Sequence, residues 1–443
     1  MKILVVGSGA REHAIVRTLA NSASRPTLFC FGTHQNPGIH TLCSDSVCGK
    51  LQEGESIIKH AKRWGIELAI IGPEAPLEYG LVDMLKAEGI ACVGPTKKLA
   101  QLECSKAFAR ELLHSYNIDA SPKYKYFTSL NGVEKFLFEL GIDGYVIKAD
   151  GLMGGKGVKV AGDHLHTFEQ ALSFCQSLID DNLTFVIEEK IAGQEFSLLS
   201  FTDGKTIIPM PLVQDHKRAL VNDEGPNTGG MGSYSDADHL LPFLTEEEYQ
   251  EALSINQAAL SALQNLCREE YRGILYASFM VTTKGLYLIE YNVRFGDPEV
   301  MNILALFEGD FAQVCHDIAH GSLGASDISF KPLATVCKYA VPHGYPDNPI
   351  KETPIDVSQV QNQAALYFGS VAYADEVLVS KGSRAIAAVG VGPSITIAEK
   401  QAETTINNIQ GKLFHRADIG TAKLIDKRVA MMKKLKREVS FSE

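Results

Sequence analysis

The chain of 443 residues is too long for a single hydrophobic core, so about three domains are expected. Its formal net charge of -11 argues against a nucleic-acid-binding surface, which would need a basic face, but permits a phosphorylated small molecule held by local amides and cations. No apolar run approaches the roughly 18–20 residues that cross a bilayer, and the N-terminus lacks the pattern of a signal peptide.

The first expected element is a strand followed by a glycine turn and a helix. Residues 2–6 form an apolar run without alternation, as in a strand buried on both faces, and GSGAREHA follows at 7–14. This is the first unit of a doubly wound sheet, and amides at the helix N-terminus can hold a phosphate. An ordinary strand-to-helix turn is the alternative. A dehydrogenase has little support, because the third glycine of a dinucleotide fingerprint is missing.

Further apolar runs continue the α/β alternation through the first domain. Strands are expected at 27–31, 68–72 and 90–94, with a helix over 78–88. Glu74 follows the second of these strands, in the kind of loop where open sheets bind ligands. It is therefore a candidate for binding ribose hydroxyls or an amine, with a merely solvated carboxylate as the alternative.

Residues 145–160 indicate a nucleotide-phosphate site. A strand ending in Lys148 leads into Gly154-Gly155-Lys156-Gly157 and then into a second strand. Glycines let backbone amides approach phosphate oxygens closely, and the two lysines add positive charge. The spacing is not that of a P-loop. A plain glycine-rich hairpin is the alternative, and such a loop could also act as a lid over a reactive intermediate.

The segment 211–235 combines cations with a glycine-rich turn. Asp215, His216 and Lys217 follow a predicted strand, and Asn227 begins a run rich in glycine. Lys217 and the arginine after it can neutralise a transferring phosphate, while glycine-rich amides can bind a carboxylate or an oxyanion. His216 has no spaced partner that would make a metal site, so a structural role is expected for it.

Residues 275–291 indicate a hairpin whose second strand organises the expected site. Simple alternation would place the following residues on one face: Leu286, Leu288, Glu290, Asn292 and Arg294. The carboxylate of Glu290 and the amide oxygen of Asn292 suit Mg²⁺, and the guanidinium of Arg294 suits a phosphate. An edge strand with a polar solvent face is the alternative. The continuation Phe-Gly-Asp-Pro-Glu is too particular for a generic surface.

The remaining elements are helices and a last α+β unit. Helices are expected over 246–266, 302–320 and 395–409. From residue 333 alternating strands and a helix suggest a small α+β domain. Residues 423–437 form a basic amphipathic tail, for which a solvated terminal helix is preferred over membrane contact.

Together these motifs resemble the ATP-grasp ligases and, more specifically, the phosphoribosylamine–glycine ligase family of purine biosynthesis. The strand ending in Glu290, Asn292 and Arg294 carries the resemblance, with the Lys148 glycine loop and the Asp215–Asn227 segment. It implies an α/β and α+β multidomain fold. The expected parts are a doubly wound N-terminal domain (1–103), an ATP-grasp module (104–326) with a mobile lobe near 123–190, a small C-terminal α+β domain (327–425) and a basic tail (426–443).

The resemblance also implies roles for individual residues. ATP would bind Lys106, Lys148, Gly155, Lys156, Gly157, Glu188, Glu189, Ile191, Glu195 and Met280, with Glu188, Glu189 and Ile191 along the adenine and Glu195 at the ribose. Phosphoribosylamine and glycine would bind Gly9, Arg11, Glu12, His13, Glu74, Asp215, Asn227, Thr228, Gly229 and Arg294. Glu290 and Asn292 would hold Mg²⁺ or Mn²⁺. Catalysis would involve Asp215, Lys217, Asn227 and Arg294.

The chain departs from the family pattern at several positions. Ala10 replaces a glycine of the first turn, Cys104 the glycine before Ser105-Lys106, Val300-Met301 a Thr-Gln pair, and Asp347 a glycine. Many ATP-grasp ligases place a further carboxylate where Ser278 stands. These departures leave open a related ATP-grasp ligase with another acid or amine. A nonenzymatic nucleotide-binding regulator is a second alternative, which the intact charged residues of the motifs argue against.

The expected reaction is phosphoryl transfer from ATP to the carboxylate of glycine. Phosphoribosylamine then attacks glycyl phosphate, giving glycinamide ribonucleotide, ADP and phosphate. Such catalysis needs positioning and charge neutralisation rather than a covalent nucleophile. The expected partners are these small molecules, with neither nucleic acid nor membrane, and the protein is expected to be a monomer or a small homo-oligomer. Nine scattered cysteines without a C-x-x-C pair favour a reducing compartment, so a cytoplasmic location is expected.

Overall fold

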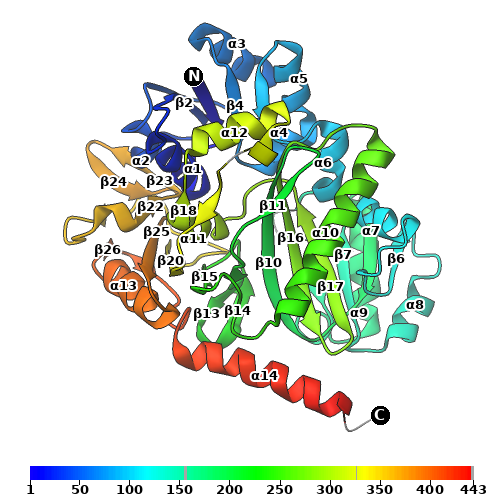
Figure 1. Cartoon of the computed structure of the whole chain (residues 1–443). Coiled ribbons are helices and arrows are strands. Elements are labelled where there is room, and N and C mark those ends of the chain that lie inside the picture. Colours follow the sequence, from blue (N-terminus) through cyan, green and yellow to red (C-terminus); the bar gives the residue numbers. More distant parts are fainter. Residues whose placement is uncertain (154–156, 326, 441–443) are drawn as a thin grey trace.

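The computed structural model describes residues 1–153, 157–325 and 327–440, so the predicted site residues Gly155 and Lys156 lie outside the described residues. The N-terminal domain lies at the top of Figure 1, the ATP-grasp module at the right and the C-terminal domain at the left. Within the described ranges, no helix is both long and apolar enough to cross a membrane.

The N-terminal domain contains a five-stranded parallel sheet in the order β3-β2-β1-β4-β5, which confirms the predicted doubly wound sheet. The predicted helix over 78–88 is two helices, because Gly80 (φ 96°) ends one and begins the next. The elements are β1 (Lys2–Val6), α1 (Ala10–Ala20), β2 (Thr27–Gly32), α2 (Pro37–His40), β3 (Asp45–Cys48), α3 (Gly54–Trp64), β4 (Leu68–Ile71), α4 (Glu74–Tyr79), α5 (Leu81–Ala87) and β5 (Ala91–Val93).

The next part has a small hydrophobic core of its own, separate from the main core of the molecule. A four-stranded antiparallel sheet in the order β6-β9-β7-β8 packs against two helices. A separate core is what a lobe that moves as a unit requires, although that motion stays a prediction. The elements are α6 (Lys97–Cys104) and α7 (Lys106–Ser115), which lead in, then β6 (Tyr124–Phe127), α8 (Val133–Leu140), β7 (Tyr145–Ala149), β8 (Val158–Val160), α9 (Phe168–Asp180) and β9 (Phe185–Glu189).

A second antiparallel sheet, in the order β11-β10-β16-β17, forms the floor of the ATP-grasp module. The predicted hairpin is confirmed as β16 (Gly273–Thr282) and β17 (Gly285–Asn292), and the predicted helix over 246–266 as α10 (Glu246–Cys267). Helix α10 covers one face of this sheet (Figure 1), and its buried apolar residues belong to the main core. The remaining strands are β10 (Gln194–Thr202) and β11 (Ile207–Pro209).

The sheet of the C-terminal domain includes two strands from the ATP-grasp segment. Its order is β12-β15-β20-β25-β22, so β12 and β15 cross the boundary predicted near residue 327, and the domain limits stay predictions. The hairpin β13–β14 projects between β12 and β15. The elements so far are β12 (Gln214–Asp215), β13 (Arg218–Leu220), η1 (Val221–Asp223), β14 (Glu224–Asn227), β15 (Gly232–Ser235), β20 (Ala334–Pro342), β22 (Leu366–Phe368), β25 (Ile386–Gly392) and α13 (Ile395–Asn407).

The helix predicted over 302–320 is interrupted. Gly309 (φ 114°) and the short strand pair β18–β19 separate α11 from α12. Val300 and Met301, which depart from the family pattern, are fully buried in α11 and belong to the core. The elements are α11 (Glu299–Leu306), β18 (Phe307–Glu308), α12 (Phe311–His320), η2 (Leu323–Ala325), β19 (Ser329–Phe330), β21 (Ile355–Asp356), η3 (Gln363–Ala365), β23 (Val371–Ala374), β24 (Val377–Ser380), β26 (Gln410–Gly411) and β27 (Leu413–Phe414).

The chain ends in a long helix, α14 (Ala422–Ser440), along the bottom of Figure 1. The helix itself was predicted, but its apolar side is not solvated. Leu424 and Met432 are buried, Met432 as part of the main core, and Ile425, Val429 and Leu435 are partly buried against that core. The expectation of a solvated tail is therefore wrong for this side, because the helix docks on the two domains above it.

Candidate active site

The strand that carries the expected metal ligands has a bulge at Ile289. Ser278 of β16 lies opposite Glu290, whereas the next residue of β16 lies opposite Leu288, so Ile289 has no opposite residue. Because of this bulge, Leu288 points into the core while Glu290 points to the other face of the sheet. The prediction that Leu288 and Glu290 share a face is wrong, since simple alternation does not hold across a bulge.

Glu290 and Asn292 nevertheless present oxygen atoms on one side of the sheet. Asn292 is buried, and its Oδ1 accepts a hydrogen bond from Nη2 of Arg294 at 2.9 Å. Carboxylate and amide oxygens are hard donors that fit Mg²⁺ or Mn²⁺. No group of three His, Cys, Asp or Glu suited to a metal occurs in the described part of the chain. These two residues would therefore share a metal with phosphate oxygens or water.

The guanidinium of Arg294 is engaged by protein groups. Its Nη2 lies 2.9 Å from Oε1 of Glu103, and its Nε lies 3.4 Å from Oε2 of Glu74. Burial alone would lower the pKa of Arg294, but Glu103 and Glu74 outweigh it and raise the pKa. These contacts occupy part of the guanidinium, and its contact with a phosphate stays a prediction. The side chain holds Asn292 and Glu74 in place.

Lys148 is held by a buried ion-pair cluster. Nζ of Lys148 lies 2.7 Å from Oε2 of Glu188, and Nε of Arg110 lies 2.7 Å from Oε1. Arg110 also donates to the carbonyl oxygens of Leu288 and Ile289, at 2.8 and 2.9 Å, which fastens the cluster to the bulge. Both carboxylate oxygens of Glu188 thus serve these cations, and its expected place along the adenine, largely through backbone groups, stays a prediction.

Replacing Glu188 by glutamine is expected to destabilise the lobe by about 3–5 kcal/mol at neutral pH, because two buried cations lose their carboxylate. Burial alone would raise the pKa of Glu188, but Arg110 and Lys148 lower it to about 2. Its stabilisation is therefore fully present above the unfolded pKa, roughly 4.3, and is lost as the pH falls toward 2. Hydrogen exchange of the amides of β7 and β9, measured from pH 7 downward, tests this.

The matched control is Glu139→Gln, which removes an exposed ion pair with Lys123 in the same lobe and is expected to change exchange little. A Glu188→Gln lobe that exchanges like the wild type at pH 7 would contradict the prediction. The prediction would also be contradicted if the difference in exchange rate between Glu188→Gln and the wild type did not become smaller below pH 4.3.

Lys106 lies where α6 meets α7, beside the glycine loop. Oγ of Ser105 accepts the amide of Phe108 and caps α7. Asp150 accepts hydrogen bonds from Oγ of Ser105 and from the amide of Lys106, at 3.0 and 2.6 Å. Nζ of Lys106 donates to the carbonyl of Gly151. The lysine is thus fixed at the start of the loop that the sequence predicted to cover phosphates.

The residues expected around the adenine lie at the junction of the lobe and the floor sheet. Glu189 ends β9, Ile191 lies in the linker to β10, and Met280 pairs with Glu195 across β10 and β16. Ile191 and Met280 are both half-buried. The structure thus brings these residues to one edge of the module, and their contact with a base stays a prediction.

A second ion pair lies on the same face as Glu290. Oε1 of Glu195 lies 2.5 Å from Nζ of Lys217 and accepts a hydrogen bond from Oγ of Ser278 at 2.7 Å. Burial alone would lower the pKa of Lys217, but Glu195 and then Glu290 raise it. Ser278, directly opposite Glu290, therefore links the metal strand to the lysine.

Asp215 is half-buried next to this cluster. Its Oδ1 accepts the amide of His216 at 2.7 Å. Burial and the nearby carboxylate of Glu299 raise its pKa well above the ordinary range. Gly230 approaches so closely that an added Cβ would lie 2.7 Å from Oδ1, and its φ of 111° also favours glycine. The glycine-rich run is thus needed for close packing against Asp215.

The segment after β14 returns to Lys217. The amide and Oγ1 of Thr228 both donate to the carbonyl of Lys217, at 2.7 and 2.8 Å. The carbonyl of Gly229 accepts a hydrogen bond from Nη1 of Arg384 at 2.7 Å. Asn227 ends the exposed strand β14. The predicted residues Lys217, Asn227, Thr228 and Gly229 are therefore brought together.

A cavity of about 230 Å³ lies where the three domains meet. The turn at 7–12, including Gly9 and Arg11, forms one wall. Nε of Arg11 lies 2.7 Å from Oε1 of Glu12, and its Nη1 lies 4.0 Å from Oε2 of Glu74. The structure thus brings Gly9, Arg11 and Glu74 together as predicted.

Glu12 and His13 have other tasks. The carboxylate of Glu12 is buried and accepts the amide of Gly9 at 2.6 Å, closing the turn from inside. His13 is buried against β22, where its Nδ1 accepts the amide of Phe368 at 2.9 Å. Burial and Arg17 lower the pKa of His13 well below its usual range, which favours the neutral ring. Both side chains thus make packing contacts, Glu12 also lines the cavity, and their contacts with a substrate stay predictions.

Three residues that line the cavity were not among the site residues predicted from the sequence: Asp297, Tyr339 and Arg384. Asp297 accepts a hydrogen bond from the hydroxyl of Tyr339 at 2.6 Å and pairs with Nη2 of Arg384 at 3.1 Å. The guanidinium of Arg384 also lies 4.7 Å from the ring centre of Tyr339. The signal for Asp297 was present in the unusual Phe-Gly-Asp-Pro-Glu run. Tyr339, by contrast, lies in an apolar strand that gave no signal.

Family models match most of the chain. Residues 1–103 match "Phosphoribosylglycinamide synthetase, N domain", residues 104–300 match "Phosphoribosylglycinamide synthetase, ATP-grasp (A) domain", and residues 335–422 match "Phosphoribosylglycinamide synthetase, C domain". The matches follow one another in the order expected from the sequence.

Curated relatives and solved structures agree. The chain is 44% identical over 436 residues to the phosphoribosylamine–glycine ligase of Methanosarcina barkeri, covering 98% of this chain and 100% of the relative. It is 44% identical over 444 residues to that of Pyrococcus horikoshii, with 99% of each covered. The crystal structure of phosphoribosylamine–glycine ligase from Thermotoga maritima matches with a TM-score of 0.81 and 27% identity, covering 94% of this chain and 100% of that one.

More distant structures share the fold. An ADP complex of N5-carboxyaminoimidazole ribonucleotide synthetase matches with a TM-score of 0.65 at 12% identity, covering 91% of this chain and 96% of that chain. The sequence matches, the structural matches and the geometry of the site point to one conclusion. The chain belongs to the phosphoribosylglycinamide synthetase family of ATP-grasp ligases.

Proposed function

We propose that this protein joins glycine to 5-phosphoribosylamine at the expense of ATP, forming glycinamide ribonucleotide, ADP and phosphate in de novo purine biosynthesis. The observation that carries the proposal is the contact chain from Lys217 through Glu195 and Ser278 to Glu290. It supports the proposal because the lysine proposed to neutralise phosphate and the carboxylate proposed to bind the metal lie on one face of the floor sheet. Family membership supplies the substrates, because the curated relatives are named phosphoribosylamine–glycine ligases.

ATP would bind between the lobe and the floor sheet. Lys106 and Lys148 would contact its phosphates, and Ile191 and Met280 its base. Glu290 and Asn292 would hold Mg²⁺ or Mn²⁺, which when bound neutralises the phosphate oxygens. The remaining predicted contacts of the nucleotide are Gly155, Lys156, Gly157, Glu189 and Glu195.

Glycine would bind beside Asp215, with its carboxylate near Asn227 and the amides of Thr228 and Gly229. Lys217 would neutralise charge on the transferring phosphoryl group, which is the main requirement of such a reaction. The raised pKa of Asp215 suits a group that takes a proton from the attacking amine. Proton acceptance by Asp215 and charge neutralisation by Lys217 are thus both proposed for residues at the end of β12.

Phosphoribosylamine would occupy the cavity where the three domains meet. Backbone amides at the start of α1 and the guanidinium of Arg11 favour an anion there. Glu74 lies on the side of the cavity that faces Arg294 and the metal strand. We further propose that the protein works in the cytoplasm on these small molecules, as a monomer or a small homo-oligomer.

ATP consumption with glycine, and with phosphoribosylamine generated from ribose 5-phosphate and ammonia, tests the function. ADP is expected only when all substrates are present, because phosphoryl transfer forms glycyl phosphate and the amine then displaces phosphate. Formation of AMP would point to adenylate chemistry and overturn the mechanism. ATP binding without turnover on this set would instead favour a related ATP-grasp ligase with another acid or amine.

A further inference from the structure

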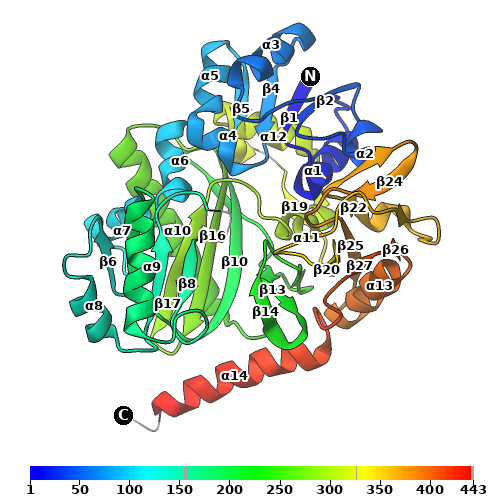
Figure 2. The ribbon, with the colours of Figure 1, turned by 180° about the vertical axis from the view of Figure 1, so that it is seen from behind.

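The C-terminal helix α14 lies against the part of the chain that carries Lys217. The family match of the C domain ends at residue 422, where α14 begins. The helix then runs beneath the hairpin β13–β14, as Figures 1 and 2 both show. Its apolar side is anchored on the main core through buried Met432 and partly buried Ile425 and Val429. The helix is therefore a fixed support next to the active site.

The hairpin above it has a strained tip. Lys217 immediately precedes β13 and Asn227 ends β14, so both proposed catalytic residues stand at its base. At the tip, Asn222 and Asp223 both have φ of 62°, in the left-handed region. Such backbone is unfavourable for residues other than glycine and persists where neighbouring groups hold it.

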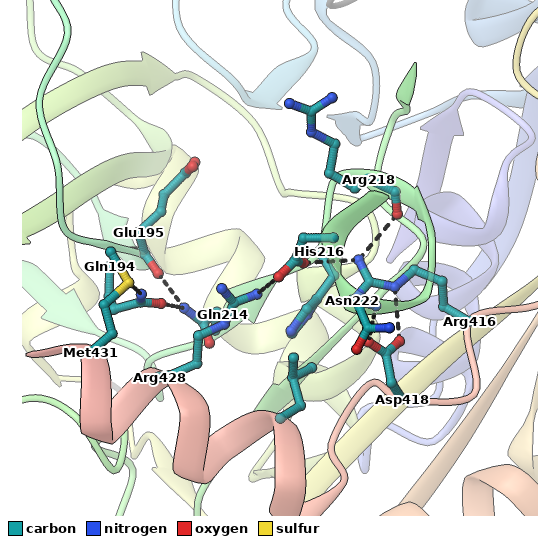
Figure 3. A network of polar contacts seen from close by, with 12 residues as sticks. Gln194, Glu195, Gln214, His216, Arg218, Asn222, Arg416, Asp418, Arg428 and Met431 are labelled. Atoms are coloured by element: carbon teal, nitrogen blue, oxygen red, sulfur yellow. Dashed lines mark hydrogen bonds and ion pairs between the residues drawn. The ribbon is translucent and has the colours of Figure 1, made fainter. Parts of the chain in front are cut away.

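Two arginines hold this tip through one carboxylate. Nη1 of Arg416 lies 3.1 Å from Oδ1 of Asp223, and Nη2 of Arg428, on α14, lies 2.6 Å from Oδ2. Arg416 also donates to the carbonyl of Arg218, and Asp418 accepts the amide of Asn222 at 2.9 Å. Figure 3 shows these groups converging on the hairpin. Each oxygen of Asp223 thus has its own cation, and only one of them comes from α14.

The same helix also reaches the neighbouring strands. Nε2 of Gln194 lies 2.8 Å from Sδ of Met431, and Nε2 of Gln214 donates to the carbonyl of Glu195 at 2.9 Å (Figure 3). His216 fills the space between Arg428 and Arg416 as a buried, structural residue, as predicted. The strands that carry Glu195 and Asp215 are therefore tied to α14 as well.

We propose that α14 supports the hairpin β13–β14 and so fixes Lys217 at its base, with Arg428 as a positioning residue for the ligation reaction. This role rests on the proposed function. Arg428 touches no proposed substrate contact and acts through Asp223. Without it, Asp223 keeps a cation on one oxygen only, and the tip is held by Arg416 and Asp418 alone, without support from α14. Lys217 then loses its fixed distance to the transferring group, whereas ATP keeps its contacts with Lys106 and Lys148.

The experiment compares Arg428→Gln with Lys436→Gln in the full-length chain. Lys436 is a matched control, because it lies on the same helix, and its ion pair of 2.6 Å goes to Glu248 of α10 rather than to the hairpin. Arg428→Gln is expected to lower kcat by about 10-fold to 100-fold with KM for ATP unchanged, as small misplacements remote from the chemistry do. Arg428→Lys is expected to restore part of kcat, and Lys436→Gln to leave it unchanged.

Limited trypsin cleavage after Arg218 gives a readout independent of turnover. Faster cleavage in Arg428→Gln than in Lys436→Gln is expected, because the hairpin is released. The proposed supporting role of α14 would be overturned by an unchanged kcat in Arg428→Gln or by an equal loss of kcat in both variants. Equal cleavage rates in both variants would overturn it as well. If the wild type itself shows no ligation, the proposed function fails, and the cleavage rates still decide whether α14 holds the hairpin.

Discussion

Replacing Glu290 by glutamine is expected to lower kcat by about 100-fold to 1,000-fold, the effect of removing one preorganised charge contact to a reacting group. The substitution keeps the shape of the side chain but removes the charge that a divalent cation requires. Since Glu290 also raises the pKa of Lys217, its loss makes the local field more positive. The metal concentration that gives half-maximal rate is therefore expected to rise strongly. Initial rates of ADP formation over a Mg²⁺ titration measure both effects.

The control is Glu251→Gln, an exposed carboxylate on α10 near the turn of the same hairpin. It is expected to leave rate and metal dependence unchanged. Asn292→Ala is expected to lose turnover with the fold intact, like Glu290→Gln. Full activity in either site variant at low Mg²⁺ would refute the assignment of these two residues as the metal ligands.

The bulge at Ile289 shows where prediction from the sequence stops. The hairpin and the common face of Glu290 and Asn292 were readable from residue types, because strand alternation is local, and their role as metal ligands stays a prediction. The bulge depends on Arg110, distant in the sequence, which donates to the carbonyls of Leu288 and Ile289. A contact between residues so far apart leaves no periodic signal in the strand itself. Local patterns thus predicted the two candidate ligands, but not the bulge that sets the register of their strand.

Arg294 and Glu103 show a second limit. The sequence offered Arg294 as a phosphate fork, because strand alternation placed it on one face with Glu290 and Asn292. In the fold, Glu103 of α6 is buried beside it, accepting the amide of Val293 at 2.7 Å as well as pairing with the guanidinium. A glutamate between the apolar residues Leu102 and Cys104 was the available signal. Buried charges need partners, so that position indicated a cation to be supplied by the tertiary structure.

The turn at residues 7–12 shows a third limit of prediction from the sequence. Its strand, glycine turn and helix were correctly predicted, and Arg11 does line the cavity. Glu12 and His13, however, are turned inward, where Glu12 closes the turn and His13 contacts β22. Helical periodicity tells which residues share a face, but not that a second domain covers that face. Residues that join domains therefore resemble ligand residues when only the sequence is known.

Lys217→Met is expected to lower kcat by about 100-fold to 1,000-fold, because the transferring phosphoryl group loses its neutralising cation. The control is Lys205→Met, which makes the same change of charge at an exposed position in the turn between β10 and β11. KM for ATP is expected to change little, since Lys106 and Lys148 keep their places. Steady-state kinetics of ADP formation with all substrates measure both constants.

The loss of kcat in Lys217→Met also has a structural explanation, in which Glu195 is left without its cation. The double variant Lys217→Met/Glu195→Gln distinguishes this explanation from the catalytic one. Ser278 would still hold the neutral glutamine, since it already donates to Oε1 of Glu195. If Lys217 serves only to balance Glu195, removing both charges is expected to restore activity, because the two effects would cancel. If Lys217 acts on the phosphoryl group, the double variant is expected to stay as slow as Lys217→Met. Restored activity would therefore move Lys217 from catalysis to the support of Glu195.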